Sequence, residues 1–128
     1  MNPQISPSLK LSETVEDWKL VYISAADTVS KTDASAAKKA NGVVEKNGVA
    51  NDRRPVHLLN GHSIIYVTAS AATTNAADAY QAADGEVQDL PVGAGTYVKV
   101  GVFMDAAAAA NDVVRVLVTD FGTEKVVT

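Results

Sequence analysis

Alternation of apolar and polar residues with a period of two constrains this chain more than any other feature. In the segment 96–104, every second residue is apolar, and these residues share one face of the predicted strand: Val98, Val100, Val102 and Met104. In 63–70 and 113–118, apolar residues also recur at every second position. In 19–24, Leu20 and Tyr22 share one face and Val21 and Ile23 share the other. Side chains of a β-strand point to opposite faces in turn, so this period is the signature of a strand. The sequence therefore predicts several short strands.

Turn dipeptides separate the predicted strands. They are Asn41-Gly42, Asn47-Gly48, Asn60-Gly61 and Asp84-Gly85, and such pairs tolerate the positive φ angles of tight turns. The apolar residues are 21 alanines and 19 valines, against 7 leucines and 4 isoleucines, a set that suits packed sheets better than helix bundles. We expect an all-β fold, a small β-sandwich or open β-barrel of short antiparallel strands with one or two short helical turns.

Five consecutive alanines, residues 106–110, lie between two valine-rich segments. Alanine has the highest helix propensity, but an isolated helix needs about 12–15 residues in water. The run therefore predicts a single helical turn or a compact loop that joins two antiparallel strands. Further helical turns are expected near 12–18 and 33–40.

The chain divides into an arm and a domain. Residues 1–17 contain two prolines and several polar residues, and they predict a flexible, extended N-terminal arm that becomes ordered on binding. Residues 18–128 predict a single β-rich domain. Segment 25–33 resembles 76–84, and 42–59 resembles 100–118. The domain is thus expected to hold two repeated strand-loop-strand units, with a nine-residue insertion in the second copy.

Charge and composition exclude several classes of protein. The net charge of −4 argues against binding of nucleic acid, which needs a basic face. No segment has the ~18 uninterrupted apolar residues of a membrane span, and the first residues lack the pattern of a signal peptide. The chain has no cysteine, so disulfides and thiolate metal sites are ruled out. We expect a protein that is made and assembled in a cytoplasm, with no membrane partner.

No motif indicates an enzyme. His57 and His62, with Asp52 nearby, do not have the spacing of metal ligands. The chain lacks a nucleophile elbow and a phosphate-binding glycine loop. Asp84, Glu86 and Asp89 are expected to form a solvated loop rather than a catalytic pair. We therefore predict no enzymatic activity, no catalytic or metal-binding residue and no cofactor.

The segment "NAADAYQAADGEVQDLPVGAGTYVKVGVFMDAAAAANDVVRVLV", residues 75–118, resembles the C-terminal half of capsid decoration (cement) proteins of tailed bacteriophages. The similarity covers about a third of the chain, and it rests on small residues around an alanine-rich turn. It implies a non-enzymatic, β-rich virion protein that binds the major capsid protein on the outer capsid surface. It further implies a homotrimer at three-fold and quasi-three-fold sites that stabilises the expanded lattice.

The candidate capsid-binding residues are Leu9, Leu11, Trp18, Arg53 and Arg54. The two leucines alternate with polar residues in the predicted arm and would pair with a strand or loop of the capsid. The two arginines suit an acidic protein partner. Two other classes remain open: a head-fibre or receptor- or carbohydrate-binding virion module, and a small β-barrel enzyme.

Overall fold

The computed structural model describes residues 6–128, which are almost entirely β-structure. The all-β fold predicted from the sequence is confirmed. The elements in chain order are β1 (Ser8–Leu11), β2 (Lys19–Ala25), β3 (Thr28–Lys31), β4 (Gly42–Val44), β5 (Arg53–Leu58), β6 (Ile64–Thr68), β7 (Asp78–Gln81), the 3-10 turn η1 (Ala83–Gly85), β8 (Val87–Gln88), β9 (Gly95–Phe103), β10 (Val113–Val118) and β11 (Glu124–Val127).

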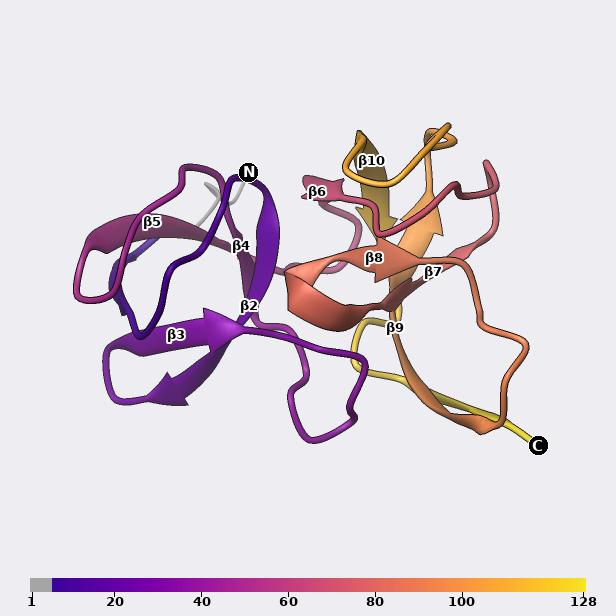
Figure 1. The fold of residues 1–128 in the computed structure, drawn as a ribbon, viewed down its shortest axis with the longest axis horizontal. Helices are drawn as coiled ribbons and strands as arrows, with labels where there is room; N and C mark the ends of the chain where they lie inside the picture. The colour runs from indigo at the N-terminus through magenta and orange to yellow at the C-terminus, as the bar shows by residue number, and fades with distance from the viewer. Residues whose placement is uncertain (1–5) are drawn as a thin grey trace.

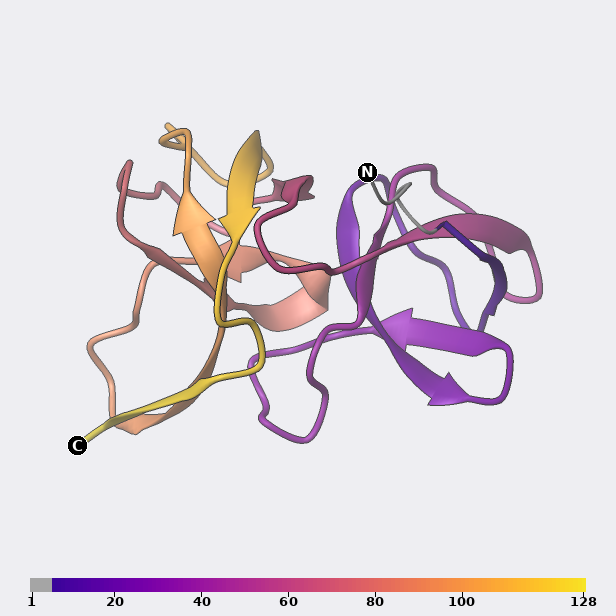
Figure 2. The ribbon, with the colours of Figure 1, turned by 180° about the vertical axis from the view of Figure 1, so that it is seen from behind.

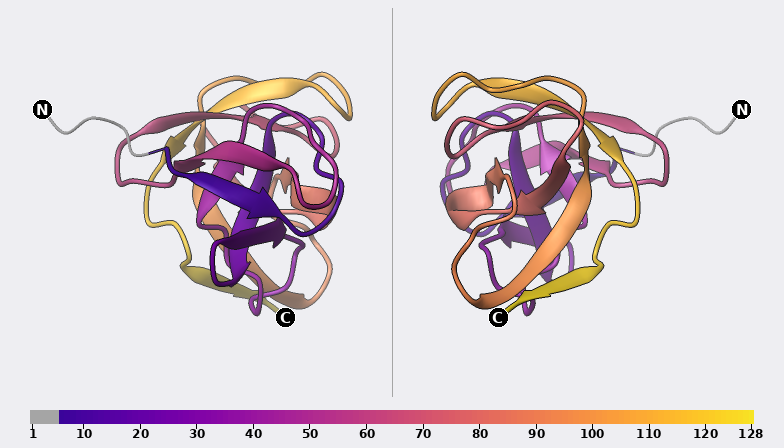
Figure 3. Two further views of the ribbon diagram at one scale, coloured as in Figure 1. Left: turned by 90° about the vertical axis from the view of Figure 1, so that its left-hand side faces the viewer. Right: turned by 90° about the vertical axis from the view of Figure 1, so that its right-hand side faces the viewer.

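The strands form two units that lie side by side along the long axis of the molecule (Figure 1). Strands β1–β5 close into a barrel, here called the N-terminal barrel, in the order β1-β3-β2-β4-β5 with β5 paired back to β1 (Figure 3, left). Strands β6–β10 form the C-terminal sheet, in the order β6-β10-β9-β7-β8. Strand β11 pairs with the first half of β9, and the two extend away from the body as a ribbon (Figure 2).

The two units are repeats of one strand arrangement. The parallel pair Leu11–Val29 of the barrel corresponds to the parallel bridge Ala69–Val87, in which both residues stand 58 positions later. The antiparallel pairs of β1 with β5, β5 with β4, β4 with β2 and β2 with β3 recur in the same order as β6 with β10, β10 with β9, β9 with β7 and β7 with β8. The paired residues of the barrel strands therefore have equivalents in the C-terminal sheet.

This equivalence revises the repeat read from the sequence. Segments 42–59 and 100–118 do match, as β4–β5 and β9–β10. Segments 25–33 and 76–84 do not, because the pair Tyr22–Ser30 corresponds to Tyr80–Gln88, which again lies 58 positions later. No nine-residue insertion exists between the described units, since the spacing grows only to 60 residues at β5 and β10.

The expected alternation of β9 is interrupted by a β-bulge. The register shifts where β9 pairs with Ala79 and Tyr80 of β7, so Val98 and Val100 are buried but the next buried residues are Gly101 and Phe103. Val102 and Met104 were expected on the buried face and lie on the outer one, half-buried. A bulge adds one residue to a strand and reverses which side chains point inward.

The alanine run forms a loop without helix. It joins the antiparallel strands β9 and β10, as expected, and the Asp112 carboxylate accepts hydrogen bonds from the backbone N–H groups of Ala108 and Ala109, at 2.9 and 3.2 Å. A side chain that binds nearby backbone groups in this way competes with the helix. The helical turns predicted near 12–18, 33–40 and 105–110 are wrong, and the described residues contain η1 instead.

Residues 8–17 belong to the barrel, so the predicted arm is wrong for them. Strand β1 pairs with both β3 and β5. Leu11 and Val15 are fully buried in the barrel core, and the backbone of Val15 exchanges hydrogen bonds with that of Gly48, at 2.9 and 3.0 Å. The leucine and valine gain more from closing this small core than from exposure on an arm. Residues 1–5 of the predicted arm lie outside the described residues.

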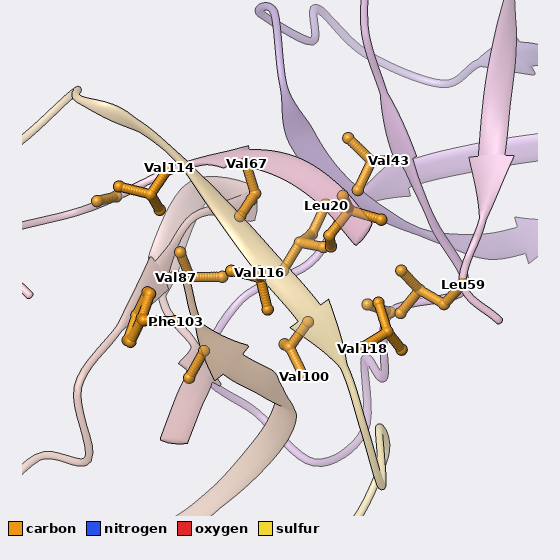
Figure 4. Packing of buried hydrophobic residues seen from close by; sticks show 14 of the residues in the cluster. Leu20, Val43, Leu59, Val67, Val87, Val100, Phe103, Val114, Val116 and Val118 are labelled. Atoms are coloured by element: carbon orange, nitrogen blue, oxygen red, sulfur yellow. The ribbon is translucent and has the colours of Figure 1, made fainter. Parts of the chain in front are cut away.

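Two apolar clusters hold the fold together. The smaller one fills the barrel with six residues, which are Leu11, Val15, Val21, Val29, Val44 and Val56. The larger one fills the C-terminal sheet, and it also includes Leu20, Val43 and Leu59 from the outside of the barrel. Figure 4 shows these three side chains beside Val116 and Val118 of β10. The barrel thus covers one side of the sheet, and the larger cluster includes residues of both units.

Candidate docking surface

The outer surface of strands β6 and β10 carries exposed apolar side chains. Ile64 of β6 pairs with Leu117 of β10, and Tyr66 pairs with Arg115. Ile64 and Tyr66 are 49% and 48% exposed, and Val113 at the start of β10 is 45% exposed. We call Ile64, Tyr66, Val113 and Leu117 the apolar face. A patch of exposed apolar side chains on adjacent strands is typical of a surface that binds another protein.

The equivalent surface of the N-terminal barrel is polar. The repeat places Ser6, Ser8, Arg53 and His57 at the positions of the four residues of the apolar face. Both units have the same strands and the same pairing, yet only one has apolar side chains on this surface. The fold itself therefore does not require the apolar face.

Trp18 borders the apolar face. Its ring lies against that of Tyr66, with centroids 5.3 Å apart and an angle of 46° between the planes, and it packs against the larger core cluster. Its φ is +58°, which is rare for a bulky residue. The equivalent Ala76 has a φ of +66°, so this backbone conformation belongs to the turn in both units. The tryptophan side chain, by contrast, is particular to the junction of the units.

Arg115 lies between Val113 and Leu117 on β10 and opposite Tyr66 of β6. Its side chain is held by Asp105. The guanidinium donates through Nε to Oδ2 and through Nη2 to Oδ1, at 2.9 and 2.8 Å, and the backbone N–H of Arg115 also donates to Oδ2. These hydrogen bonds lower the pKa of Asp105 from 3.8 to about 2. The arginine is thereby fixed in one orientation beside Tyr66.

A pocket of about 230 Å³ adjoins the apolar face where the two units meet. Trp18 and Tyr66 form its aromatic wall, and Val43 and Ile65 also line it. A wider, open groove of about 790 Å³ lies on the other side of Trp18, between residues 14–19 and the loop 47–49. Trp18 therefore lines both hollows at this junction.

The five sequence-predicted contact residues do not share one surface. Trp18 lies at the edge of the apolar face, Leu9 is half-buried against the barrel core, and Leu11 is fully buried and has no surface to offer a partner. Arg53 binds Asp27 through both Nη atoms, at 2.7 and 2.9 Å, and this pairing lowers the pKa of Asp27. Arg54 donates through Nε to the Asn47 carbonyl at 2.9 Å.

The acidic residues expected in a solvated loop have structural roles. The side chain of Lys19 is 6% exposed and contacts Glu86 at 2.5 Å and Asp84 at 3.5 Å. Lys31 contacts Asp84 at 2.6 Å, which lowers the pKa of Asp84. Asp89 accepts hydrogen bonds from the backbone and hydroxyl of Thr74. Asp84 and Glu86 therefore clamp η1 of the C-terminal sheet to the barrel.

The described residues contain no group of three or more histidine, aspartate or glutamate side chains placed to hold a metal ion. His57 binds Ser6 Oγ and Glu45 Oε1, and His62 is exposed in the turn before β6. Among residues 6–128, no helix has the length and apolar character needed to cross a bilayer.

Sequence reasoning missed the apolar face. Its signal was present, because segments 63–70 and 113–118 are apolar at positions on both sides of the strand. Such runs are typical of strands that are covered on both faces, whereas the chain itself covers only one.

The chain is similar in fold to solved structures of phage proteins. The chain matches no protein-family model and no curated protein. It is similar to the base of the head fibre gp8.5 of bacteriophage phi29, with a TM-score of 0.71 and 14% identity over 96% of this chain and 100% of the other. It is also similar to a chain in the capsid of the Myoviridae phage XM1, with a TM-score of 0.62 and 19% identity over 94% of this chain and 86% of the other. The expected likeness to phage head proteins is confirmed at the level of the fold.

Proposed function

We propose that this chain is a structural protein of a phage head, which binds the outer surface of the capsid and stabilises the expanded lattice of the major capsid protein. The observation that carries the proposal is the full-length fold similarity to a head-fibre base and to a chain of a phage capsid. The apolar face supports it, because this surface is absent from the equivalent strands of the barrel. The chain acts by binding and carries out no reaction.

The proposed assembly is a homotrimer at three-fold and quasi-three-fold sites, formed in the host cytoplasm and retained on the virion. Strand β6 and the first residue of β10 supply the contact with the capsid protein through Ile64, Tyr66 and Val113. The net charge of −4 disfavours contact with packaged DNA. Arg53 and Arg54 become secondary contacts, since both already bind groups of their own chain.

A second candidate function is that of a base for a head fibre or another receptor- or carbohydrate-binding module. It is favoured by the similarity to the head-fibre base, which matches over the whole of that chain. In this case the same face would attach the chain to the capsid, and the projecting ribbon of β9 and β11 would lie toward further protein. The two functions differ in whether particles without the chain lose stability or lose only an appendage.

Co-sedimentation with undecorated, expanded particles of the parent phage tests the proposal. The double variant Ile64→Ser/Tyr66→Ser gives β6 the residues that the barrel carries at Ser6 and Ser8. We expect it to bind particles at least about tenfold more weakly, since burial of each apolar side chain contributes about 1.5–3 kcal/mol. The control Val126→Ser alters a residue that is 62% exposed on β11 and should bind like the wild type. Equal binding of the double variant and the control would refute the assigned face.

Heating the particles separates the two functions. Particles decorated with a lattice-stabilising protein should disrupt at a higher temperature than undecorated ones, because a ligand that binds only the intact lattice stabilises it. A fibre base that contacts a single capsid subunit would bind that subunit equally well in the intact and the disrupted lattice, and it would therefore give no such shift. A cryo-electron microscopy map of the decorated particle would then locate the chain and its copy number.

A further inference from the structure

The pocket beside the apolar face combines aromatic walls with a single carboxylate. Trp18 and Tyr66 form one side, Val43 and Ile65 contribute apolar surface, and Glu45 and His57 supply the polar groups. Among the described residues that line it, Glu45 is the one acidic side chain, and neither lysine nor arginine is present. The pocket therefore offers two aromatic rings and a negative charge at the same place.

The polar groups of the pocket are oriented by the chain itself. His57 Nε2 lies 3.0 Å from Glu45 Oε1, and His57 Nδ1 lies 2.8 Å from Ser6 Oγ. Both ring nitrogens of the histidine are thus engaged. The Glu45 side chain is 55% exposed. Its hydrogen bond with His57 uses Oε1, so a ligand in the pocket could donate a hydrogen bond to Oε2.

We propose that this pocket receives the guanidinium group of an arginine side chain from the capsid protein. A cation over the face of tryptophan or tyrosine is attracted by the ring quadrupole, and arginine is the side chain most often found there. Its planar group can stack on the aromatic wall while it donates hydrogen bonds to a carboxylate. The assignment of the arginine to a capsid protein rests on the proposed function, whereas the guanidinium preference rests on the pocket alone.

A neutral sugar fits the same pocket less well. Sugars need several free hydrogen-bonding groups around a stacking ring, but both nitrogens of His57 are already occupied, and Val43 and Ile65 offer only apolar surface. The guanidinium needs one carboxylate and one aromatic face, and the pocket has both. A sugar ligand is therefore an outcome that the test must distinguish.

Intrinsic fluorescence reads this pocket directly, because Trp18 is the only tryptophan of the chain. The probe is argininamide. The control is citrullinamide, which has nearly the same shape but carries a neutral urea group in place of the charged guanidinium group. At pH 8, argininamide should change the emission saturably, with half-saturation on the order of millimolar. Citrullinamide should give no saturable change.

The variant Glu45→Gln removes the charge and keeps the shape of the side chain. It should weaken argininamide binding at least about tenfold, with an unchanged melting temperature. The matched control Glu124→Gln removes a carboxylate that lies on β11 and pairs with Lys39, and its response should equal that of the wild type. Equal responses to the two amides, no response to argininamide, or saturation by methyl glucoside in its place would overturn the guanidinium assignment.

Particle binding then tests the partner. Glu45→Gln should co-sediment with undecorated particles at least about tenfold more weakly than Glu124→Gln. If the wild type binds and Glu45→Gln binds equally well, the capsid arginine is refuted while the proposed function stands. If the wild type itself fails to bind, the proposed function and the capsid source of the arginine both fail, and the amide titration still decides whether the pocket selects a guanidinium.

Discussion

Replacement of Gly101 by alanine should destabilise the protein severely, for a reason set by the backbone. The added Cβ would lie 2.0 Å from the carbonyl oxygen of Leu117 and 2.8 Å from its carbonyl carbon. Both atoms belong to the main chain of β10, which pairs with β9 at this point. Rotation of a side chain cannot relieve such a contact, so the two strands must move apart.

The expected loss follows from two costs. Overpacking of a well-packed interior costs about 1–3 kcal/mol, and each hydrogen bond weakened between β9 and β10 costs about 1 kcal/mol more. The free energy of unfolding should therefore fall by about 3–5 kcal/mol, a large part of the ~5–15 kcal/mol that a domain ordinarily has. The melting temperature should fall by about 10–20 °C.

Urea unfolding at equilibrium, followed by circular dichroism, measures this loss against two other glycines. Gly61→Ala is the control, because nothing lies within 4 Å of its added Cβ, and its stability should stay unchanged or rise by up to about 1 kcal/mol. Gly42 is the barrel equivalent of Gly101, and its Cβ would lie 2.7 Å from the carbonyl oxygen of His57. Gly42→Ala should be destabilising to a smaller degree. If Gly101→Ala matched Gly61→Ala, the close approach of β9 and β10 at Gly101 would be wrong.

Three further tests address other parts of the structure. Leu11→Ala should lower the free energy of unfolding by about 2–5 kcal/mol in urea titrations, because the side chain is fully buried in the barrel. A negligible loss would indicate that this segment is an arm outside the barrel. Lys19→Met should lower the free energy of unfolding by about 3–5 kcal/mol, because it leaves the Glu86 carboxylate, which is 14% exposed, without its partner. The control Lys38→Met breaks an exposed pair with Asp33 and should lower it by less than about 1 kcal/mol. The pKa of Asp105 is lowered from 3.8 to about 2, mainly by the side-chain hydrogen bonds of Arg115. This pair therefore stabilises the fold at pH values above 3.8, the pKa of the unfolded chain, and its contribution is lost as the pH falls through about 2. A carboxyl titration by NMR should place its midpoint near 2 in the wild type and near the ordinary value in Arg115→Gln.

The strands themselves were predictable because their signal is local. Segment 113–118 coincides with β10, and 19–24 and 63–70 lie within one residue or two of β2 and β6. The bulge in β9 was not predictable from alternation, since the reversal at Gly101 depends on pairing with β7. A pattern of period two assumes an unbroken register, and only the partner strand reveals where that register shifts.

The N-terminal segment shows the opposite limit. Pro3, Pro7 and the polar residues around them are typical of an arm, yet four residues, 8–11, complete the barrel by pairing on both sides. One buried leucine, Leu11, and one buried valine, Val15, are a weak signal in a polar context. Their value comes from closure of the barrel, which removes two free strand edges at once.

The apolar face shows how a repeat can identify a functional surface without any relative for comparison. The two units share strand order, register and even the positive φ of Trp18 and Ala76, so they are subject to the same demands from folding. Side chains that differ between equivalent positions on the outside therefore reflect something other than the fold. At the β6–β10 surface, Tyr66 occupies the position that is equivalent to Ser8 of the barrel. This difference places an exposed aromatic ring next to Trp18, the single tryptophan. Exposed aromatic area is costly to keep in water, and a partner that covers it would recover that cost.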